Sequence, residues 1–322
     1  MRVQTVLGAV AAESLGRTLV HEHLFLAYPG SEFDPRLVFD RAAFVRLACR
    51  RLEALKHFGV ATIVDPCPIE FGRDVGLMAE ISERAGIHVV CTTGFYFERL
   101  GLPPYWRGRS AEQIAALYIE EAENGIGAAR IRPGAIKCAT GAGAISALEE
   151  RFLTAACLAH HATGLPIITH TQGGTCGPEQ QALFTRNGVA PHRCLIGHCC
   201  ENPDPAYHRR IVEGGSYIGF DRIGLTRLQS DEVRADNLVR LVRSGFGSQV
   251  MMSQDRYCAL IGDPLSEAPS AEVLAQMARG EWPPPYSYLF TDFIPMLRER
   301  GLADSEIFPM LDDTPRRFLS GT

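Results

Sequence analysis

Short runs of apolar residues recur along the chain, separated by longer segments in which apolar residues return every three or four positions. Continuous apolar runs are typical of buried parallel strands, and the longer spacing is typical of amphipathic helices. We therefore expect eight strands, each followed by a helical segment. The expected strands are 18–23, 60–65, 87–92, 134–139, 166–171, 193–198, 216–221 and 249–255.

The helical segments carry start and end signals. Residues 39–58 place apolar side chains at near-helical spacing and are followed by Gly59, and a further helix is expected over 73–85. Ser110 and Ser146 each stand three residues before a Gln or Glu, which is the pattern of a capping box. We expect helices to begin directly after these two serines.

Eight strand–helix units in succession predict an α/β fold, the (β/α)8 or TIM barrel, with its site at the carboxyl ends of the strands. Before the first unit, residues 3–8 alternate like a short strand that turns at Gly8, which predicts a short N-terminal β-hairpin over one end of the barrel. No linker, low-complexity run or charge block divides the 322 residues. We expect a single barrel domain over residues 1–322.

Composition and charge narrow the classes of partner. The net charge of -5 offers no basic patch, so neither nucleic acid nor an anionic membrane is an expected partner, and a small-molecule substrate is. No run of 18 apolar residues occurs, and the first residues lack the apolar core of a signal peptide, so a cytoplasmic location is expected. The ten cysteines contain no C-x-x-C pair and suggest reduced, buried thiols.

Two histidines stand at the end of the first expected strand. Side chains two apart on a strand point to the same face, so His21 and His23 would project together. Two imidazoles held this close are natural ligands for one metal ion. An isolated His-x-His is more often a hydrogen-bonded surface pair, so the metal interpretation depends on the other strand ends.

Four other strands carry potential ligands near the same end. They are Lys137, His170, His198 and Asp255. Because the carboxyl ends of parallel barrel strands meet at one mouth, all six side chains would point to the same place. We therefore predict a metal centre there.

The number of ligands favours two metal ions. Four imidazoles and one carboxylate exceed the three protein ligands of one catalytic zinc, and two dications roughly 3.5 to 4 Å apart need bridging anions. Lys137, one of only two lysines, lies in an apolar run where burial would lower its pKa. The neutral amine can add carbon dioxide and become an anionic, bidentate carbamate. The alternative is a lysine that extends to solvent.

Several motifs together resemble the phosphotriesterase family of the amidohydrolase superfamily, which also contains lactonases. The motifs are Val3-Gln4-Thr5-Val6-Leu7-Gly8, His21-Glu22-His23, Gly72-Arg73-Asp74, Ile136-Lys137, Thr169-His170-Thr171, Ile196-Gly197-His198, Ser253-Gln254-Asp255 and Pro315-Arg316-Arg317-Phe318. The resemblance implies a binuclear centre with His21, His23 and Asp255 on a buried metal and His170 and His198 on a more exposed one. Carboxylated Lys137 and a hydroxide would bridge them.

The resemblance also implies a mechanism. The bridging hydroxide would attack the substrate, and Asp255 would accept the proton of this nucleophile. Tyr96 matches a lactonase tyrosine that reaches toward the substrate oxygen, and Arg222 matches an arginine of the same pocket. The alternatives are an aromatic lid for Tyr96, and for Arg222 an ion pair with Asp221 or a surface role. Zinc is the expected metal, although cobalt, manganese or iron would also suit these ligands.

Substrate choice is the least determined feature, because loops after the strands carry specificity in these barrels. The loops 94–108 and 256–290 differ from those of the known enzymes, and Trp282 and Tyr286 could line the pocket or pack against the rim. We expect lactone hydrolysis with weak phosphotriesterase activity. The alternatives are a phosphoester or amide hydrolase and, last, a barrel that only binds. A homodimer is compatible with the resemblance.

Overall fold

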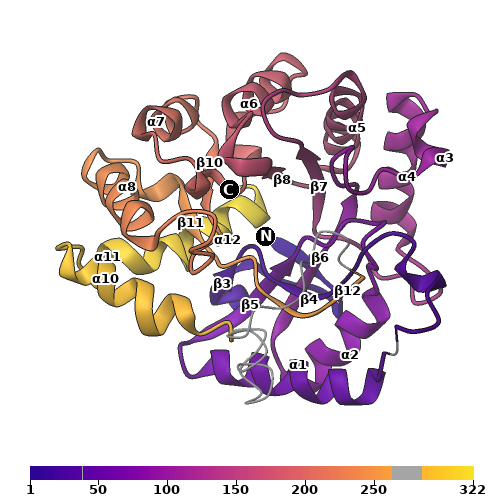
Figure 1. Cartoon of the computed structure of the whole chain (residues 1–322), viewed down its shortest axis with the longest axis horizontal. Coiled ribbons are helices and arrows are strands. Elements are labelled where there is room, and N and C mark those ends of the chain that lie inside the picture. Colours follow the sequence, from indigo (N-terminus) through magenta and orange to yellow (C-terminus); the bar gives the residue numbers. More distant parts are fainter. Residues whose placement is uncertain (38, 263–284) are drawn as a thin grey trace.

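The computed structural model of the chain describes residues 1–37, 39–262 and 285–322. Its centre is a sheet of eight strands surrounded by helices (Figure 1). The strands are β3 (Arg17–Leu19), β5 (Val60–Asp65), β6 (His88–Gly94), β7 (Ala135–Thr140), β8 (Ile167–Thr171), β9 (Cys194–Ile196), β10 (Tyr217–Phe220) and β11 (Val250–Met252). They follow one another in chain order across the sheet, and each neighbouring pair is parallel.

The sheet curves until its first and last strands approach each other. Beyond β3 and β11, the backbone N–H of Asp255 donates to the carbonyl of His21 at 3.0 Å, and the N–H of His21 donates to Ser253 Oγ at 3.0 Å. This arrangement confirms the predicted (β/α)8 barrel. It also places the start and the end of the barrel side by side at the carboxyl ends of the strands.

Helices of the outer ring pack between successive strands (Figure 1). The larger ones are α1 (Arg41–Lys56), α2 (Val75–Ala85), α4 (Ala111–Asn124), α5 (Ala147–Thr163), α6 (Gly177–Arg186), α7 (Pro205–Glu213) and α8 (Asp231–Arg243). Both expected capping boxes are confirmed: Ser110 with Gln113 and Ser146 with Glu149 each exchange two hydrogen bonds at the start of a helix. The shorter helices in the described ranges are α3 (Pro104–Arg107), α10 (Ile294–Glu299), α11 (Asp304–Ile307) and α12 (Asp313–Ser320).

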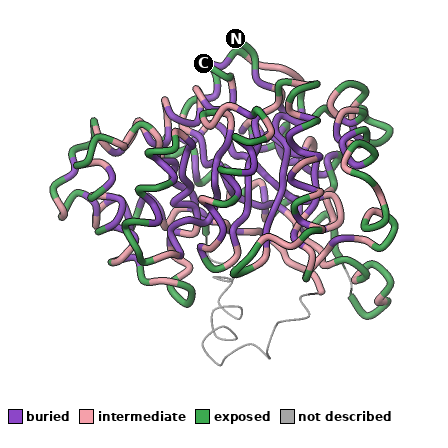
Figure 2. Tube along the Cα trace, turned by 90° about the horizontal axis from the view of Figure 1, so that it is seen from above, coloured by how far each residue is buried: buried purple, intermediate pink, exposed green. Residues whose placement is uncertain are grey.

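The amino end of the barrel is closed by the two ends of the chain. The predicted hairpin is confirmed as β1 (Arg2–Thr5) paired antiparallel with β2 (Gly8–Ala11). Phe318 of α12 is fully buried in a cluster with apolar side chains that fill this end of the barrel. The members of that cluster include Leu15, Val20, Val64, Val90, Ile168, Leu195 and Met251. Both termini therefore lie at the same end of the molecule (Figure 2).

The expected strand 18–23 is wrong in its extent. β3 ends at Leu19, and a separate strand β4 (His23–Ala27) pairs in parallel with β12 (Tyr257–Ile261). The reason is Glu22, whose buried carboxylate accepts hydrogen bonds from Ser253 Oγ and from the N–H groups of Gln254 and Arg256, all at 2.9 Å. These bonds draw the chain out of the sheet between the two histidines.

Three other strands end earlier than expected, and β10 is the least affected because it ends at Phe220, one residue short. β9 stops before His198 and β11 stops before Asp255, and both residues adopt positive φ angles of 60° and 53°. Such angles are strained for residues with a Cβ atom and are frequent at functional sites. The two side chains therefore project from tight turns just beyond the strands.

The cysteines agree with the expectation of reduced, buried thiols. All ten cysteines are unpaired, and nine of them are buried. Lys56 is exposed at the end of α1. Within the described ranges, no helix has both the length and the apolar character needed to cross a membrane.

Phe318→Ala tests the closure of the amino end. The substitution opens a cavity in the cluster around Phe318, so we expect it to lower the free energy of unfolding by about 3 to 5 kcal/mol in urea titrations. Phe33→Ala is the matched control, because Phe33 is 83% exposed and its change should stay within about 0.5 kcal/mol. Equal effects of the two substitutions would contradict this role of α12.

Candidate metal centre

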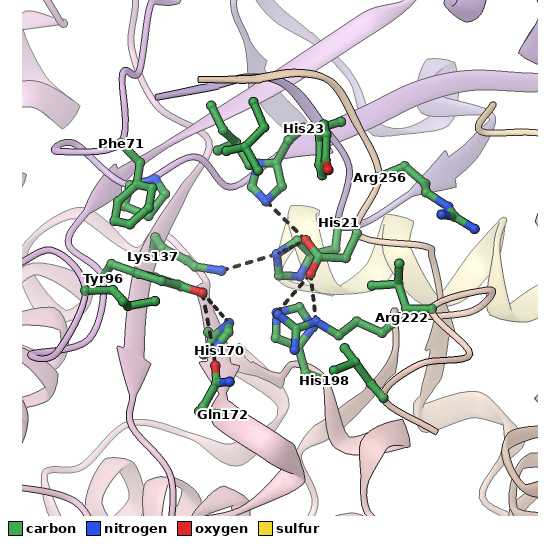
Figure 3. Close-up of a pocket in the computed structure, with 18 of the residues that line it drawn as sticks. His21, His23, Phe71, Tyr96, Lys137, His170, Gln172, His198, Arg222 and Arg256 are labelled. Carbon is green, nitrogen blue, oxygen red and sulfur yellow. Dashed lines mark hydrogen bonds and ion pairs between the residues drawn. The ribbon is translucent and has the colours of Figure 1, made fainter. Parts of the chain in front are cut away.

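A cavity of about 320 Å³ opens at the carboxyl ends of the barrel strands. Every residue predicted for the site lines it, namely His21, His23, Tyr96, Lys137, His170, His198, Arg222 and Asp255. In Figure 3 the four histidines, Lys137 and Tyr96 gather around one centre. The structure thus brings together side chains that are far apart in the sequence.

His21, His23 and Asp255 form a compact group of possible ligands. Nε2 of His23 lies 3.3 Å from Oδ1 of Asp255, and Nε2 of His21 lies 3.8 Å from the same oxygen. One such atom from each residue lies within 4.8 Å of the other two. Two imidazole nitrogens and a carboxylate oxygen at these separations suit one divalent cation.

Two buried carboxylates hold the outer side of three histidine rings. Asp65 accepts a hydrogen bond from Nδ1 of His23 at 2.9 Å. Asp221 accepts from Nδ1 of His21 at 2.9 Å and from Nδ1 of His198 at 3.1 Å. Because an ionised carboxylate can only accept, each ring carries a proton on Nδ1 and directs its Nε2 atom into the cavity. Asp221, His21 and His198 also lie close together, but the hydrogen bonds show that Asp221 orients the two rings.

The sequence predictions omit Asp65 and give Asp221 only an alternative ion pair with Arg222. A usable signal exists, since Asp65 is the last residue of β5 and Asp221 directly follows β10. The strand-end rule that selects the histidines would have selected both carboxylates. Glu22, by contrast, is recognisable only from its tertiary contacts.

His198 stands between two other imidazoles. Its ring centroid lies 4.5 Å from that of His21 and 4.5 Å from that of His170. Nε2 of His170 lies 2.8 Å from the amide oxygen of Gln172, a residue that the sequence predictions also omit. His170 and His198 therefore supply further possible nitrogen ligands beside the group formed by His21, His23 and Asp255.

Lys137 is buried at the centre, with 1% of its surface exposed. Its Nζ atom lies 3.3 Å from Nε2 of His21 (Figure 3), which excludes the alternative of a lysine extending to solvent. Burial lowers the pKa of Lys137 to about 8. A neutral amine, the form that reacts with carbon dioxide, is therefore accessible near neutral pH.

The protonation states of the histidines are compatible with a bound cation. Burial lowers the pKa of His21 and of His170 well below the usual value, so both rings are neutral and keep a lone pair. Burial also acts on His23, but hydrogen bonds to Asp255 and Asp65 outweigh it and raise the pKa of His23 to about 9. The two carboxylates therefore favour a positive charge at His23. A metal ion would compete with the proton on His23 for this position.

Arg222 and Asp255 form an ion pair inside the cavity. Nε of Arg222 donates to Oδ2 of Asp255 at 2.7 Å, and its Nη1 donates to Glu201. Burial opposes ionisation of Asp255, but the charge of Arg222 outweighs it and holds the pKa of Asp255 well below its usual range. The alternatives of an Asp221 pair or a surface role for Arg222 are therefore wrong.

Tyr96 follows β6 and belongs to an aromatic group beside His170. Its hydroxyl lies 3.2 Å from Nδ1 of His170, and its ring packs against Phe71 with centroids 4.8 Å apart. The backbone N–H of Tyr96 donates to Glu70 at 2.8 Å, which fixes the start of this loop. Burial raises the pKa of Tyr96 above its usual value, so the hydroxyl remains a hydrogen-bond donor.

Of the aromatic residues expected near the pocket in the last long loop, one is described. Tyr286 is buried away from the cavity, and its hydroxyl donates to the carbonyl of His23 at 2.6 Å. This contact agrees with packing against the rim. Trp282 lies outside the described residues.

Comparisons with known proteins agree with this geometry. An aryldialkylphosphatase of Saccharolobus solfataricus is 31% identical over 97% of both chains. A phospho-furanose lactonase of Mycoplasmopsis synoviae is 28% identical over 98% of this chain and 91% of the relative. The solved structure of an organophosphorus hydrolase from Deinococcus radiodurans superposes with a TM-score of 0.92 and 37% identity, covering 99% of this chain and 97% of the other.

The phosphotriesterase family model matches residues 1–319, which is nearly the whole chain. The match agrees with the barrel, with the convergence of the predicted residues and with the resemblance inferred from the motifs. The chain belongs to the phosphotriesterase family, and it is a metal-dependent hydrolase.

Proposed function

We propose that this hydrolase is a lactonase with a binuclear metal centre and weak phosphotriesterase activity. The observation that carries the proposal is the position of Tyr96 and Arg222, which line the same cavity as the six candidate ligands. The overall reaction adds water to the carbonyl carbon of the lactone and breaks the ring C–O bond, giving a hydroxy acid.

The donor set supports two adjacent ions. His21, His23 and Asp255 would hold one, His170 and His198 the other, and Lys137, as its carbamate, would bridge them. Zinc is our choice because imidazole and carboxylate donors suit it. When bound, two such ions supply an activated water at neutral pH and polarise the oxygen of the substrate.

Asp255 and Arg222 act together in proton transfer. The Arg222 charge keeps Asp255 ionised, so that this carboxylate takes the proton of the attacking water and then passes it to the alkoxide that leaves. Glu201 holds Arg222 from its other side. The ion pair therefore positions the proton acceptor at the edge of the ligand cluster.

Tyr96 stabilises the oxygen of the substrate. Its hydroxyl lies beside His170 and stays protonated, so it donates a hydrogen bond to an oxygen that gains negative charge during ring opening. The wall around it includes the apolar side chains of Leu26, Phe71, Leu100, Leu228 and Leu260. An uncharged cyclic ester with an apolar substituent matches the Tyr96 hydroxyl donor and this apolar part of the wall.

A panel of substrates tests the proposal. We expect zinc-reconstituted protein to hydrolyse γ- and δ-lactones with a kcat/KM at least about tenfold above that for a phosphotriester, a difference of 1.4 kcal/mol in barrier. Phosphomonoesters and amides complete the panel, and Lys137→Ala is the blank. Faster turnover of phosphoesters or amides would contradict the lactonase proposal, and zinc binding without any turnover would indicate a binding barrel.

Tyr96→Phe tests the role of the hydroxyl. Removing one donor to a developing oxyanion costs about 100-fold or more in rate, so lactone kcat/KM should fall by that order. Zinc content and the midpoint of thermal unfolding should stay at the values of the unmodified protein, because the ring packing is retained. Unchanged lactone turnover would show that Tyr96 only covers the barrel mouth.

Asp221→Asn tests the orientation of the ligands. The amide nitrogen of the new side chain would face an N–H donor of His21 or His198, so we expect zinc affinity to fall by about 10- to 100-fold. Competition with a chromogenic chelator measures it. Asp236→Asn is the matched control, since the Asp236 side chain is 61% exposed on α8 and its substitution should leave affinity unchanged.

A further inference from the structure

One of the four histidines lacks a carboxylate partner in the described part of the chain. His21, His23 and His198 donate from Nδ1 to Asp65 or Asp221. His170 instead meets the neutral amide of Gln172, and it does so through Nε2 at 2.8 Å. The ring of His170 is therefore held through Nε2 and not through Nδ1, and its acceptor is uncharged.

The position of Gln172 is fixed by its backbone. It begins a short 3-10 helix, Gln172–Gly174, directly after β8. Its carbonyl accepts hydrogen bonds from the N–H and the hydroxyl of Thr175, at 3.3 Å and 2.8 Å. The side chain also lines the cavity beside His170 (Figure 3). A fixed backbone two residues after the histidine therefore sets the distance between amide and ring.

The remaining contacts of the His170 ring are with other rings and a hydroxyl. The ring stacks on Phe97 with centroids 5.4 Å apart at an interplanar angle of 17°. It meets His198 edge-on at 85°. The hydroxyl of Tyr96 lies 3.2 Å from Nδ1 and 3.4 Å from Nε2. These contacts hold the plane of the ring. Among the described residues, Gln172 is the one that distinguishes the two ring nitrogens, because its amide oxygen can only accept a hydrogen bond.

The amide oxygen of Gln172 accepts the proton of Nε2, which leaves the lone pair on Nδ1. A neutral acceptor also makes the imidazole a weaker base than a carboxylate would, and such partners tune the affinity of a metal site. We propose that Gln172 is a positioning residue that makes His170 present Nδ1 and keeps its cation the more weakly bound of the two. This inference rests on the proposed binuclear centre.

Zinc release from two variants tests the inference. Protein loaded with zinc is exposed to an excess of chelator, and the ions left per chain are counted over time. We expect unmodified protein to lose one ion well before the other. Gln172→Glu supplies a charged acceptor and should slow the first loss by about tenfold, whereas Gln172→Leu removes the acceptor and should speed it by a similar factor. The second loss should be unchanged in both.

A charge control separates the hydrogen bond from simple attraction. Leu228→Glu adds a carboxylate at a 39% exposed position on the cavity wall, and the first loss should keep the rate of the unmodified protein. If Leu228→Glu slows release as much as Gln172→Glu does, the hydrogen bond is not the cause. Matching thermal unfolding of the metal-free variants shows that each one has folded.

The tautomer gives a second readout that does not require metal. Long-range 1H–15N spectra of the metal-free protein should show His170 protonated on Nε2 and a mixture of tautomers in Gln172→Leu. Fewer than two ions in loaded, unmodified protein would overturn the proposed binuclear centre. Two ions with equal release rates in all three forms, or His170 protonated on Nδ1, would overturn only the role of Gln172.

Discussion

The buried carboxylate of Asp221 is the interaction on which the centre depends most. It accepts Nδ1–H from both His21 and His198, and it also accepts the backbone N–H of His198 at 2.6 Å. An isolated charge at such depth would be very unfavourable, and these three donors offset that cost. In return, the carboxylate fixes two rings that come from different parts of the barrel.

Burial favours unprotonated nitrogen atoms, which are able to bind a metal ion. The environment that excludes water lowers the pKa of Lys137 and of His21, and this keeps nitrogen lone pairs available. The positive φ angles of His198 and Asp255 show that the backbone adopts strained conformations where these side chains leave the strands. The surrounding hydrogen bonds maintain these conformations, so the geometry is preorganised.

The sequence predicts the barrel well because apolar strands and amphipathic helices alternate with a clear period. It also predicts the candidate ligands, because they lie within or just beyond strands that share one mouth. It fails around residues 18–23, where the contacts of Glu22 with a distant segment override the local pattern. The predictions also omit Asp65 and Asp221 as partners of the histidines, although their positions at strand ends are a usable signal. They omit Gln172 because its role depends on which atoms become neighbours after the barrel has closed.

The contact between the segments that follow β3 and β11 can form only after both segments have been synthesised. His21 and Asp255 meet where the first and last strands approach, joined by a backbone hydrogen bond of 3.0 Å. A ribosome releases the segment with His21 long before the segment with Asp255. The nascent chain therefore carries most of the barrel while its centre is still incomplete, and reactivity arises only when the final strand joins.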